Sequence, residues 1–124
     1  MENILIIDDD PVVRHILSTI LSELTFEVFE AGTSFEGLEI LKQHASQNGI
    51  SFVFLDFMLD NTNSEPTLEQ IRKEITPTPK ICLISSHTEE EIGEQAEKIS
   101  PDYFLQKPFR IDDVKRALEA MKIK

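Results

Sequence analysis

Charged and hydroxyl side chains stand at the ends of four short apolar runs in this sequence. They are Asp8 and Asp9 after the first run, Asp56 after the second, Ser85 at the end of the third and Lys107 after the fourth. Three carboxylates repel one another when they are brought together, unless a cation lies among them. An all-oxygen ligand set favours a hard ion such as Mg2+, so a magnesium site is the first chemistry that these residues suggest.

The remaining two residue types suit a phosphoryl group. A lysine such as Lys107 offers a point charge to phosphoryl oxygens, and the hydroxyl of Ser85 can donate a hydrogen bond to one of them. Positioning and charge neutralisation supply most of the catalysis in phosphoryl transfer, so a metal ion, a lysine and an in-line nucleophile are sufficient parts. The set as a whole therefore fits phosphoryl transfer to a carboxylate.

The elements that must position these residues begin with the run Phe52-Val53-Phe54-Leu55, which ends in Asp56. Four large apolar residues without polar alternation are typical of a strand buried on both faces, the usual state of a central strand in a parallel sheet. Ligands bind at the carboxyl ends of the strands in open α/β sheets. An aspartate that leaves a strand is more often a turn residue. Asp56 is a candidate functional residue because three other strand ends also carry polar side chains.

Strands and helices alternate along the chain. The predicted strands are 4–7, 25–30, 52–56, 80–85 and 103–106. Three of the predicted helices are 11–24, 68–75 and 89–99. A further helix begins at a capping box from Thr33 to Glu36, and the last helix carries the apolar stripe Ile111, Val114, Ala117, Leu118 and Met121. This alternation predicts one α/β domain, a doubly wound, five-stranded parallel sheet with five helices on both faces. The five polar residues then gather at one edge of the sheet.

Local signals fix several of these boundaries. Asp10 before Pro11 predicts an N-cap followed by proline in the first helical turn, and Val13, Ile16, Leu17, Ile20, Leu21 and Leu24 then recur at helical spacing. The segment 25–30 alternates polar and apolar residues, as an edge strand does. The helix at 89–99 is strongly acidic with few apolar positions, and we expect it to be lightly anchored. The polar segment 60–67 is predicted to be a loop.

Length and charge exclude several classes of protein. At 124 residues the chain is long enough for one domain with its own core, and no output domain fits within it. The formal net charge of −11 would repel a phosphate backbone or an anionic membrane surface, so direct nucleic-acid or membrane binding is not expected. Cys82 is the only cysteine, so no internal disulfide can form, and no apolar run is long enough for a membrane span. These features predict a cytoplasmic protein.

Four motifs in fixed order resemble the receiver domain of two-component response regulators, of the chemotaxis type. They are Ile4-Leu5-Ile6-Ile7-Asp8-Asp9-Asp10-Pro11 with Arg14 following, Phe54-Leu55-Asp56, the hydroxyl at Ser85, and Lys107-Pro108-Phe109. The resemblance covers essentially the whole chain, residues 1–124, as a single receiver domain. It implies a flavodoxin-like sheet with strand order 2-1-3-4-5.

The resemblance also implies a role for each residue of the site. Asp56 corresponds to the phosphoacceptor nucleophile, and Asp9 to a direct magnesium ligand with Asp8 assisting through water. The backbone carbonyl of Met58 would bind the same ion. Lys107 would pair with the phosphoryl group and Ser85 would hydrogen-bond it, which is the switch step. Phe104 matches the aromatic residue whose rotamer follows that switch.

Three positions depart from the family pattern. The family often has proline four residues after the acceptor and glycine eight residues after it, where this chain has Asp60 and Ser64. Ser100 stands where a glycine commonly ends the fourth helix, and a non-glycine residue in a left-handed conformation is costly there. These departures leave the geometry of the loop after the third strand and the end of the fourth helix open.

The function implied by the resemblance is a phosphoacceptor switch that is not an enzyme beyond its own phosphorylation and dephosphorylation. Its expected partners are a histidine kinase or phosphotransfer protein and a downstream protein target, with the chain a monomer or weak dimer. One alternative is a degenerate receiver that acts as a constitutive binding module. Another is a magnesium-dependent phosphatase of the haloacid dehalogenase type, although that class uses a second aspartate where this chain has Met58. A flavin-binding flavodoxin is disfavoured because the aspartates at 8–10 would repel the flavin phosphate.

Overall fold

The computed structural model describes residues 2–45, 49–59 and 61–123 and contains one five-stranded parallel sheet. Its strands are β1 (Asn3–Ile7), β2 (Glu27–Ala31), β3 (Ile50–Asp56), β6 (Lys80–Ser85) and β7 (Tyr103–Gln106). They lie in the order β2-β1-β3-β6-β7, with every neighbouring pair parallel. This is the doubly wound, flavodoxin-like order that the resemblance implies, so the predicted fold class is confirmed.

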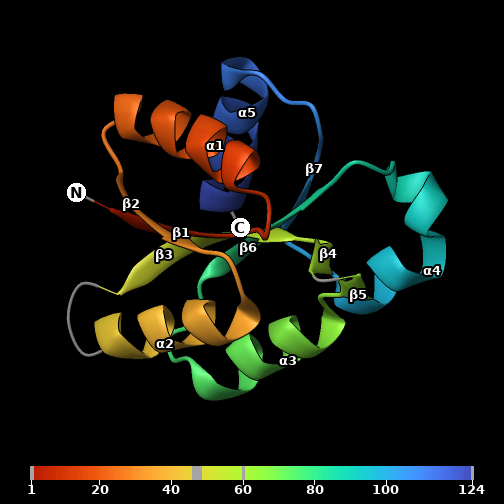
Figure 1. The fold of residues 1–124 in the computed structure, drawn as a ribbon, viewed down its shortest axis with the longest axis horizontal. Coiled ribbons are helices and arrows are strands. Elements are labelled where there is room, and N and C mark those ends of the chain that lie inside the picture. Colours follow the sequence, from red (N-terminus) through yellow and green to blue (C-terminus); the bar gives the residue numbers. More distant parts are fainter. Residues whose placement is uncertain (1, 46–48, 60, 124) are drawn as a thin grey trace.

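Five helices within the described residues cover the two faces of the sheet (Figure 1). They are α1 (Pro11–Glu23), α2 (Ser34–His44), α3 (Glu65–Glu74), α4 (Glu89–Ile99) and α5 (Ile111–Ile123). Helices α1 and α5 pack on one face, and α2, α3 and α4 pack on the other, as the two separate hydrophobic clusters require. None of the described helices has both the length and the apolar character needed to cross a bilayer.

The central strands are apolar throughout because successive side chains supply the two cores in turn. Leu5 and Ile7 of β1 join the core under α2, α3 and α4, whereas Ile4 and Ile6 join the core under α1 and α5. In β3, Val53 and Leu55 belong to the first core, and Phe52 and Phe54 belong to the second. The apolar run that precedes Asp56 is therefore packed on both faces, and it holds that residue at the carboxyl edge of the sheet.

Caps at the predicted helix starts are present. The Asp10 side chain accepts a hydrogen bond from the Val12 amide at 2.9 Å, and Pro11 is the first residue of α1. The Thr33 hydroxyl accepts from the Glu36 amide at 3.1 Å and caps α2. The N-cap of α1 fixes the turn that carries Asp8 and Asp9 out of β1, because that turn enters the helix directly.

Some boundaries and burial assignments from the sequence are wrong. Strand β2 starts at Glu27 because Thr25 and Phe26 still close α1, through hydrogen bonds from their amides to the carbonyls of Ser22 and Leu21. Helix α3 starts at Glu65, three residues before the first apolar position, since the Asn63 side chain accepts from the Glu65 amide.

Two residues placed in apolar stripes are exposed instead. Ile16 of α1 and Ile111 of α5 are 46% and 37% exposed, so the stripes that bury α1 and α5 are narrower than the spacing suggests. Where the apolar stripe is wider than the helix surface that contacts the sheet, the residues at the sides of the stripe stay exposed to solvent.

The segment after β3 is more regular than a loop. Met58–Leu59 (β4) and Thr62–Asn63 (β5) pair antiparallel, with Met58 opposite Asn63 and Leu59 opposite Thr62. Asn61 in the turn has φ 62°, a left-handed conformation that asparagine tolerates better than most residues. Asp60 lies outside the described residues. Ser64 has φ −87°, so the residue in place of the family's glycine carries no left-handed strain.

Ser100, at the end of α4, does adopt the left-handed conformation, with φ 48°. Its carbonyl and that of Ile99 accept hydrogen bonds from the Arg72 guanidinium at 2.7 and 2.8 Å, which holds the backbone in place. The non-glycine residue at the end of the fourth helix is therefore held in the left-handed conformation that the sequence predicts to be unfavourable.

We expect Ser100→Gly to raise the free energy of unfolding by about 1 kcal/mol, because glycine adopts positive φ without the clash of a Cβ atom. The exposed Ser100 side chain is not needed for packing. Urea unfolding followed by circular dichroism measures the change. Ser100→Ala is the matched control and should bring no gain, since it keeps Cβ; equal stability of the glycine and alanine variants would contradict the strain.

Candidate functional site

The carboxyl ends of β1, β3, β6 and β7 lie at one edge of the sheet, because all four strands run parallel. Asp8 and Asp9 leave β1, Asp56 ends β3, Ser85 ends β6 and Lys107 follows β7. The register pairs Ile7 with Leu55, so the acidic ends of β1 and β3 are level with each other. The predicted gathering of the strand-end residues is thus the geometry of the folded chain.

Three carboxylates form the centre of the site. Asp8, Asp9 and Asp56 each offer an oxygen atom, and these atoms lie within 4.8 Å of one another. Asp8 and Asp56 are buried, whereas Asp9 is exposed. One oxygen of Asp8, Oδ1, accepts a hydrogen bond from the Asp10 amide at 2.9 Å, which fixes the orientation of this carboxylate. A hard, oxygen-seeking cation fits this donor set, which combines close spacing, negative charge and an open side at Asp9.

The ammonium group of Lys107 lies beside two of the carboxylates. Its Nζ atom is 3.0 Å from Oδ2 of Asp8 and 3.5 Å from Oδ1 of Asp56. The Lys107 amide donates to the Ser85 carbonyl at 2.7 Å. This hydrogen bond holds the backbone of the lysine against the end of the neighbouring strand, β6. The site thus contains an ammonium group beside its carboxylates. Lys107 follows β7 and Asp9 follows β1, so the two residues approach Asp56 from opposite sides of β3.

Burial and charge change the acidity of two groups in this site. Desolvation is the largest cause that raises the pKa of Asp56, followed by the charge of Asp8; Lys107 opposes them, and the pKa rises from 3.8 to about 7. Burial lowers the pKa of Lys107, but the charges of Asp56 and Asp8 outweigh this effect and the net direction is upward. The lysine therefore stays protonated, whereas Asp56, even with this lysine beside it, needs additional positive charge to ionise fully at neutral pH.

This elevated pKa predicts a pH dependence of stability in the magnesium-free protein. The folded state binds the Asp56 proton more tightly than the unfolded state, so this contribution to stability is complete below about pH 4. It is lost as the pH rises through about 7. Asp56→Asn should remove this dependence and be more stable than wild type above pH 7.

The measurement is urea unfolding in the presence of a chelator at a series of pH values between 4 and 8. Asp112→Asn, at an exposed position in the first turn of α5, is the control and should run parallel to wild type. The elevated pKa would be contradicted if wild type and Asp56→Asn also ran parallel.

Two of the remaining predicted residues, Ser85 and Met58, lie at the same edge of the sheet, whereas Phe104 lies within β7, three residues before Lys107. The buried hydroxyl of Ser85 accepts from the His87 amide at 3.0 Å, and its neighbour Ser86 is exposed. Met58 is 38% exposed, and its amide lies 3.5 Å from Oδ1 of Asp56. Phe104 is the second of the four residues of β7, and its side chain packs against the core under α2, α3 and α4.

Two features of the site are not apparent from residue spacing. One is the contact of Arg14 with the Asp8 carbonyl at 2.6 Å; the sequence places Arg14 in a motif without giving it a partner. The other is the anchoring of the β4–β5 hairpin, in which the Phe57 amide donates to the Ile84 carbonyl and the Ser64 amide donates to the Phe57 carbonyl, each at 2.8 Å. Both are contacts of the backbone, which the side-chain pattern does not reveal.

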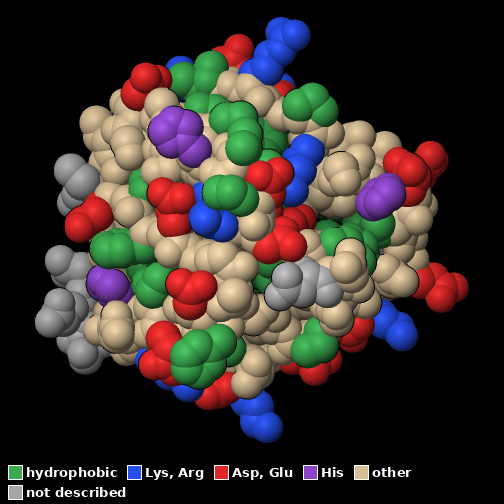
Figure 2. Space-filling model, in the orientation of Figure 1, with side chains coloured by type: hydrophobic (Ala, Val, Ile, Leu, Met, Phe, Trp, Pro, Cys, Tyr) green, Lys and Arg blue, Asp and Glu red, His purple; other side chains and the backbone are tan. Residues whose placement is uncertain are grey.

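Acidic side chains outnumber basic ones on the surface of the molecule. Figure 2 shows red acidic side chains across the visible face, with fewer blue basic ones among them. This agrees with the 23 acidic and 12 basic residues of the sequence. Long-range electrostatic forces therefore favour a cationic partner or ligand.

Comparison with known proteins gives one consistent result. The profile of the response regulator receiver domain matches residues 4–119. An NtrX-like response regulator of Rickettsia bellii is 31% identical over 128 aligned residues, which cover 98% of this chain and 26% of that protein. The chain spans about a quarter to a half of the length of the first curated relatives that it matches.

Solved structures agree with the sequence relatives. A receiver domain protein from Clostridium thermocellum is 27% identical with a TM-score of 0.83, covering 99% of this chain and 96% of that one. The response regulator TrrA of Thermotoga maritima, solved in complex with Mg2+ and BeF, is 26% identical with a TM-score of 0.75 and covers 98% and 99% of the two chains.

Proposed function

The chain belongs to the response regulator receiver domain family, and from this premise we propose that it is a phosphoacceptor switch whose acceptor is Asp56. The observation that carries the proposal is the buried Asp56 carboxylate, which lies within reach of two other carboxylates and 3.5 Å from the Lys107 ammonium. The phosphodonor is the phosphohistidine of a histidine kinase or a phosphotransfer protein. We place this exchange in the cytoplasm, as the sequence predicts.

In the proposed reaction an oxygen of Asp56 attacks the phosphorus atom of the phosphohistidine. The P–O bond of an acyl phosphate forms as the P–N bond breaks, and the electron pair stays on the imidazole nitrogen, which takes up a proton. The Lys107 ammonium, already 3.0 Å from Asp8 and 3.5 Å from Asp56, neutralises charge on the phosphoryl oxygens. Ser85 donates its hydroxyl to a phosphoryl oxygen once the acyl phosphate has formed.

A magnesium ion would be held by Asp8, Asp9, Asp56 and the Met58 carbonyl. When bound, it supplies positive charge that keeps Asp56 ionised and balances the charge of the incoming phosphoryl group. The carboxylates of this chain do the binding, and the hydrogen bond from the Asp10 amide keeps Asp8 in the orientation required. Asp9 is exposed, so solvent reaches this side of the site and could supply the water ligands that Mg2+ usually keeps.

A small phosphodonor tests the proposal and separates it from its alternatives. Wild type incubated with phosphoramidate and Mg2+ should gain the mass of one phosphoryl group, and hydroxylamine should remove it, because an acyl phosphate is the product. A degenerate receiver would gain none. A phosphatase of the haloacid dehalogenase type would release phosphate repeatedly from unrelated phosphoesters. Such a phosphatase uses a second aspartate two residues after the first, where this chain has the exposed Met58.

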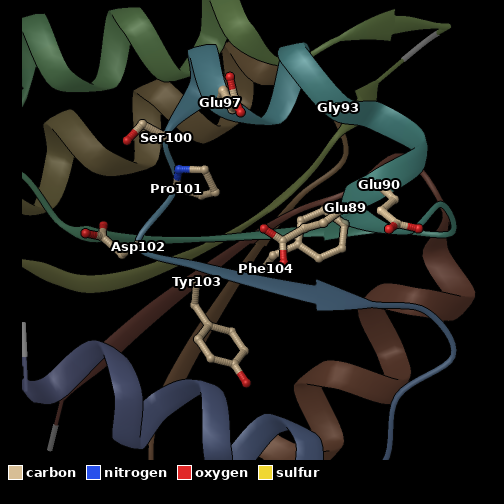
Figure 3. A pocket seen from close by; sticks show the side chains of 9 residues that line it. All are labelled: Glu89, Glu90, Gly93, Glu97, Ser100, Pro101, Asp102, Tyr103 and Phe104. Carbon is tan, nitrogen blue, oxygen red and sulfur yellow. The ribbon is translucent and has the colours of Figure 1, made fainter.

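Output is proposed to occur at the face formed by α4, β7 and α5. A hollow of about 1060 Å3 lies there between α4 and β7, and it is lined by the acidic side chains of Glu89, Glu90, Glu97 and Asp102 and by the aromatic rings of Tyr103 and Phe104. Figure 3 shows the Phe104 ring beside Glu89 on the α4 side of β7, whereas Tyr103 points to the opposite side of the strand. This arrangement suits a partner with a basic surface and opposes self-association through α4.

The light anchoring of α4 supports movement of this face. The helix has a non-helical residue inside it, Gly93, with φ 44° and ψ −117°. Among the side chains of α4 that the structure describes, the buried apolar ones are Ile92 and Ile99. A hydroxyl drawn towards the phosphoryl group leaves space that the Phe104 ring can occupy, which is a change between two packing states.

We therefore expect beryllofluoride with Mg2+ to change hydrogen exchange in residues 85–99 and at Phe104. The physical reason is that the Ser85 end of β6 leads directly into α4. Amide exchange followed by mass spectrometry, with Asp56→Asn as the unresponsive control, measures the effect. Changes confined to the loops that hold Asp9 and Asp56 would contradict output through α4.

A further inference from the structure

Arg14 connects the ends of two strands from within the first helix. Its Nη1 atom donates to the Asp8 carbonyl at 2.6 Å, and its Nε atom lies 3.5 Å from Oε1 of Glu30, the penultimate residue of β2. The guanidinium group therefore joins β1 and β2 at the edge of the sheet that carries the carboxylate site. Its side chain is 21% exposed, so the group is largely enclosed by these contacts.

Gly32 leaves room for this arrangement. A Cβ atom at position 32 would lie 3.2 Å from Nη1 of Arg14, which is tighter than ordinary van der Waals contact. The guanidinium thus packs directly against the main chain after β2, and the geometry of its hydrogen bond to Asp8 is confined from that side. A flexible surface arginine would have no such restriction.

We infer that Arg14 is a positioning residue for the cation ligands, an inference that rests on the magnesium site of the proposed function. The carbonyl that it binds belongs to the peptide bond between Asp8 and Asp9. Fixing the plane of this peptide fixes the directions in which both carboxylates leave the chain. The Asp10 amide holds the Asp8 carboxylate itself at 2.9 Å, so the two contacts together orient the turn.

Position and charge predict opposite effects for the loss of Arg14. The guanidinium is positive and repels a divalent cation, so its removal should tighten Mg2+ binding if charge alone matters. If Arg14 orients the ligands, its removal should weaken Mg2+ binding, by about tenfold, as is typical for groups that support metal ligands. The sign of the change therefore separates the two accounts.

The experiment is calorimetric titration of the full chain with Mg2+ at a temperature where circular dichroism shows every variant folded. Arg14→Ala should bind Mg2+ about tenfold more weakly than wild type. Arg14→Lys keeps the charge but loses the rigid guanidinium fork, and it should also bind several-fold more weakly. Glu30→Gln keeps the arginine and its carbonyl contact, and it should stay within about twofold of wild type.

Three results would overturn the inference: Mg2+ binding by Arg14→Ala that equals or exceeds wild type, unchanged binding by Arg14→Lys, or a loss in Glu30→Gln as large as in Arg14→Ala. Lower thermal stability in chelator does not substitute for the change in affinity, because a purely structural role would produce it too. Failure of wild type itself to bind Mg2+ would instead reject the proposed site, so the two failures are distinguishable.

Discussion

Asp56→Asn is expected to take up no phosphoryl group under conditions in which wild type is labelled to one group per chain. The amide that replaces the carboxylate lacks the anionic oxygen that attacks phosphorus, so the loss is complete rather than partial. The substitution is nearly isosteric and also removes a carboxylate whose pKa burial has raised, and we therefore expect the variant to fold. Intact mass after incubation with phosphoramidate and Mg2+ measures the result.

Asp10→Asn is the matched control for this experiment. Asp10 stands next to the carboxylate cluster, and its side chain caps α1 through the Val12 amide. Asparagine caps a helix about as well as aspartate, so this variant should keep both the fold and the labelling. Full labelling of Asp56→Asn would show that another group accepts the phosphoryl group.

Mg2+ is expected to raise the melting temperature of wild type by about 5 °C at about 10 mM. Binding to the native state alone stabilises by RT ln(1 + [Mg2+]/Kd), which is about 1.4 kcal/mol for a Kd on the order of 1 mM. The ion also relieves the repulsion among Asp8, Asp9 and Asp56, whose oxygen atoms lie within 4.8 Å of one another.

Asp9→Ala should lose this stabilisation, because it removes the exposed ligand on the open side of the site. Thermal unfolding with Mg2+ and with chelator measures both variants, and Asp10→Asn again serves as the control that keeps the effect. A wild-type melting temperature that does not respond to Mg2+ would contradict the site, as would an undiminished response in Asp9→Ala.

The sequence predicted the sheet and the gathering of the site because strand burial leaves a clear pattern. Apolar runs at 4–7 and 52–55 can supply two cores only from the centre of a parallel sheet, and their polar ends then meet at one edge. The bounds of β6 and β7 agree with the prediction, since proline or a charged residue flanks each run.

Features that depend on backbone contacts could not be predicted in the same way. The β4–β5 hairpin has only two residues in each strand, too few for an alternating pattern, and its position depends on the bond from the Phe57 amide to the Ile84 carbonyl. The hydrogen bond from Arg14 to the Asp8 carbonyl has no counterpart in residue spacing. Ser64 and Ser100 both replace expected glycines, but only Ser100 adopts a positive φ.

Chemical mapping of the phosphorylated residue tests the central claim most directly. Borohydride reduces the acyl phosphate of an aspartate to homoserine, so the modified position can be read from the peptides of the labelled protein. We predict homoserine at Asp56, in a yield that follows the phosphoryl content and falls to zero when Mg2+ is removed by a chelator. Homoserine at Asp8 or Asp9, or a phosphorylated protein that yields none at Asp56, would contradict the assignment of this buried carboxylate as the phosphoacceptor.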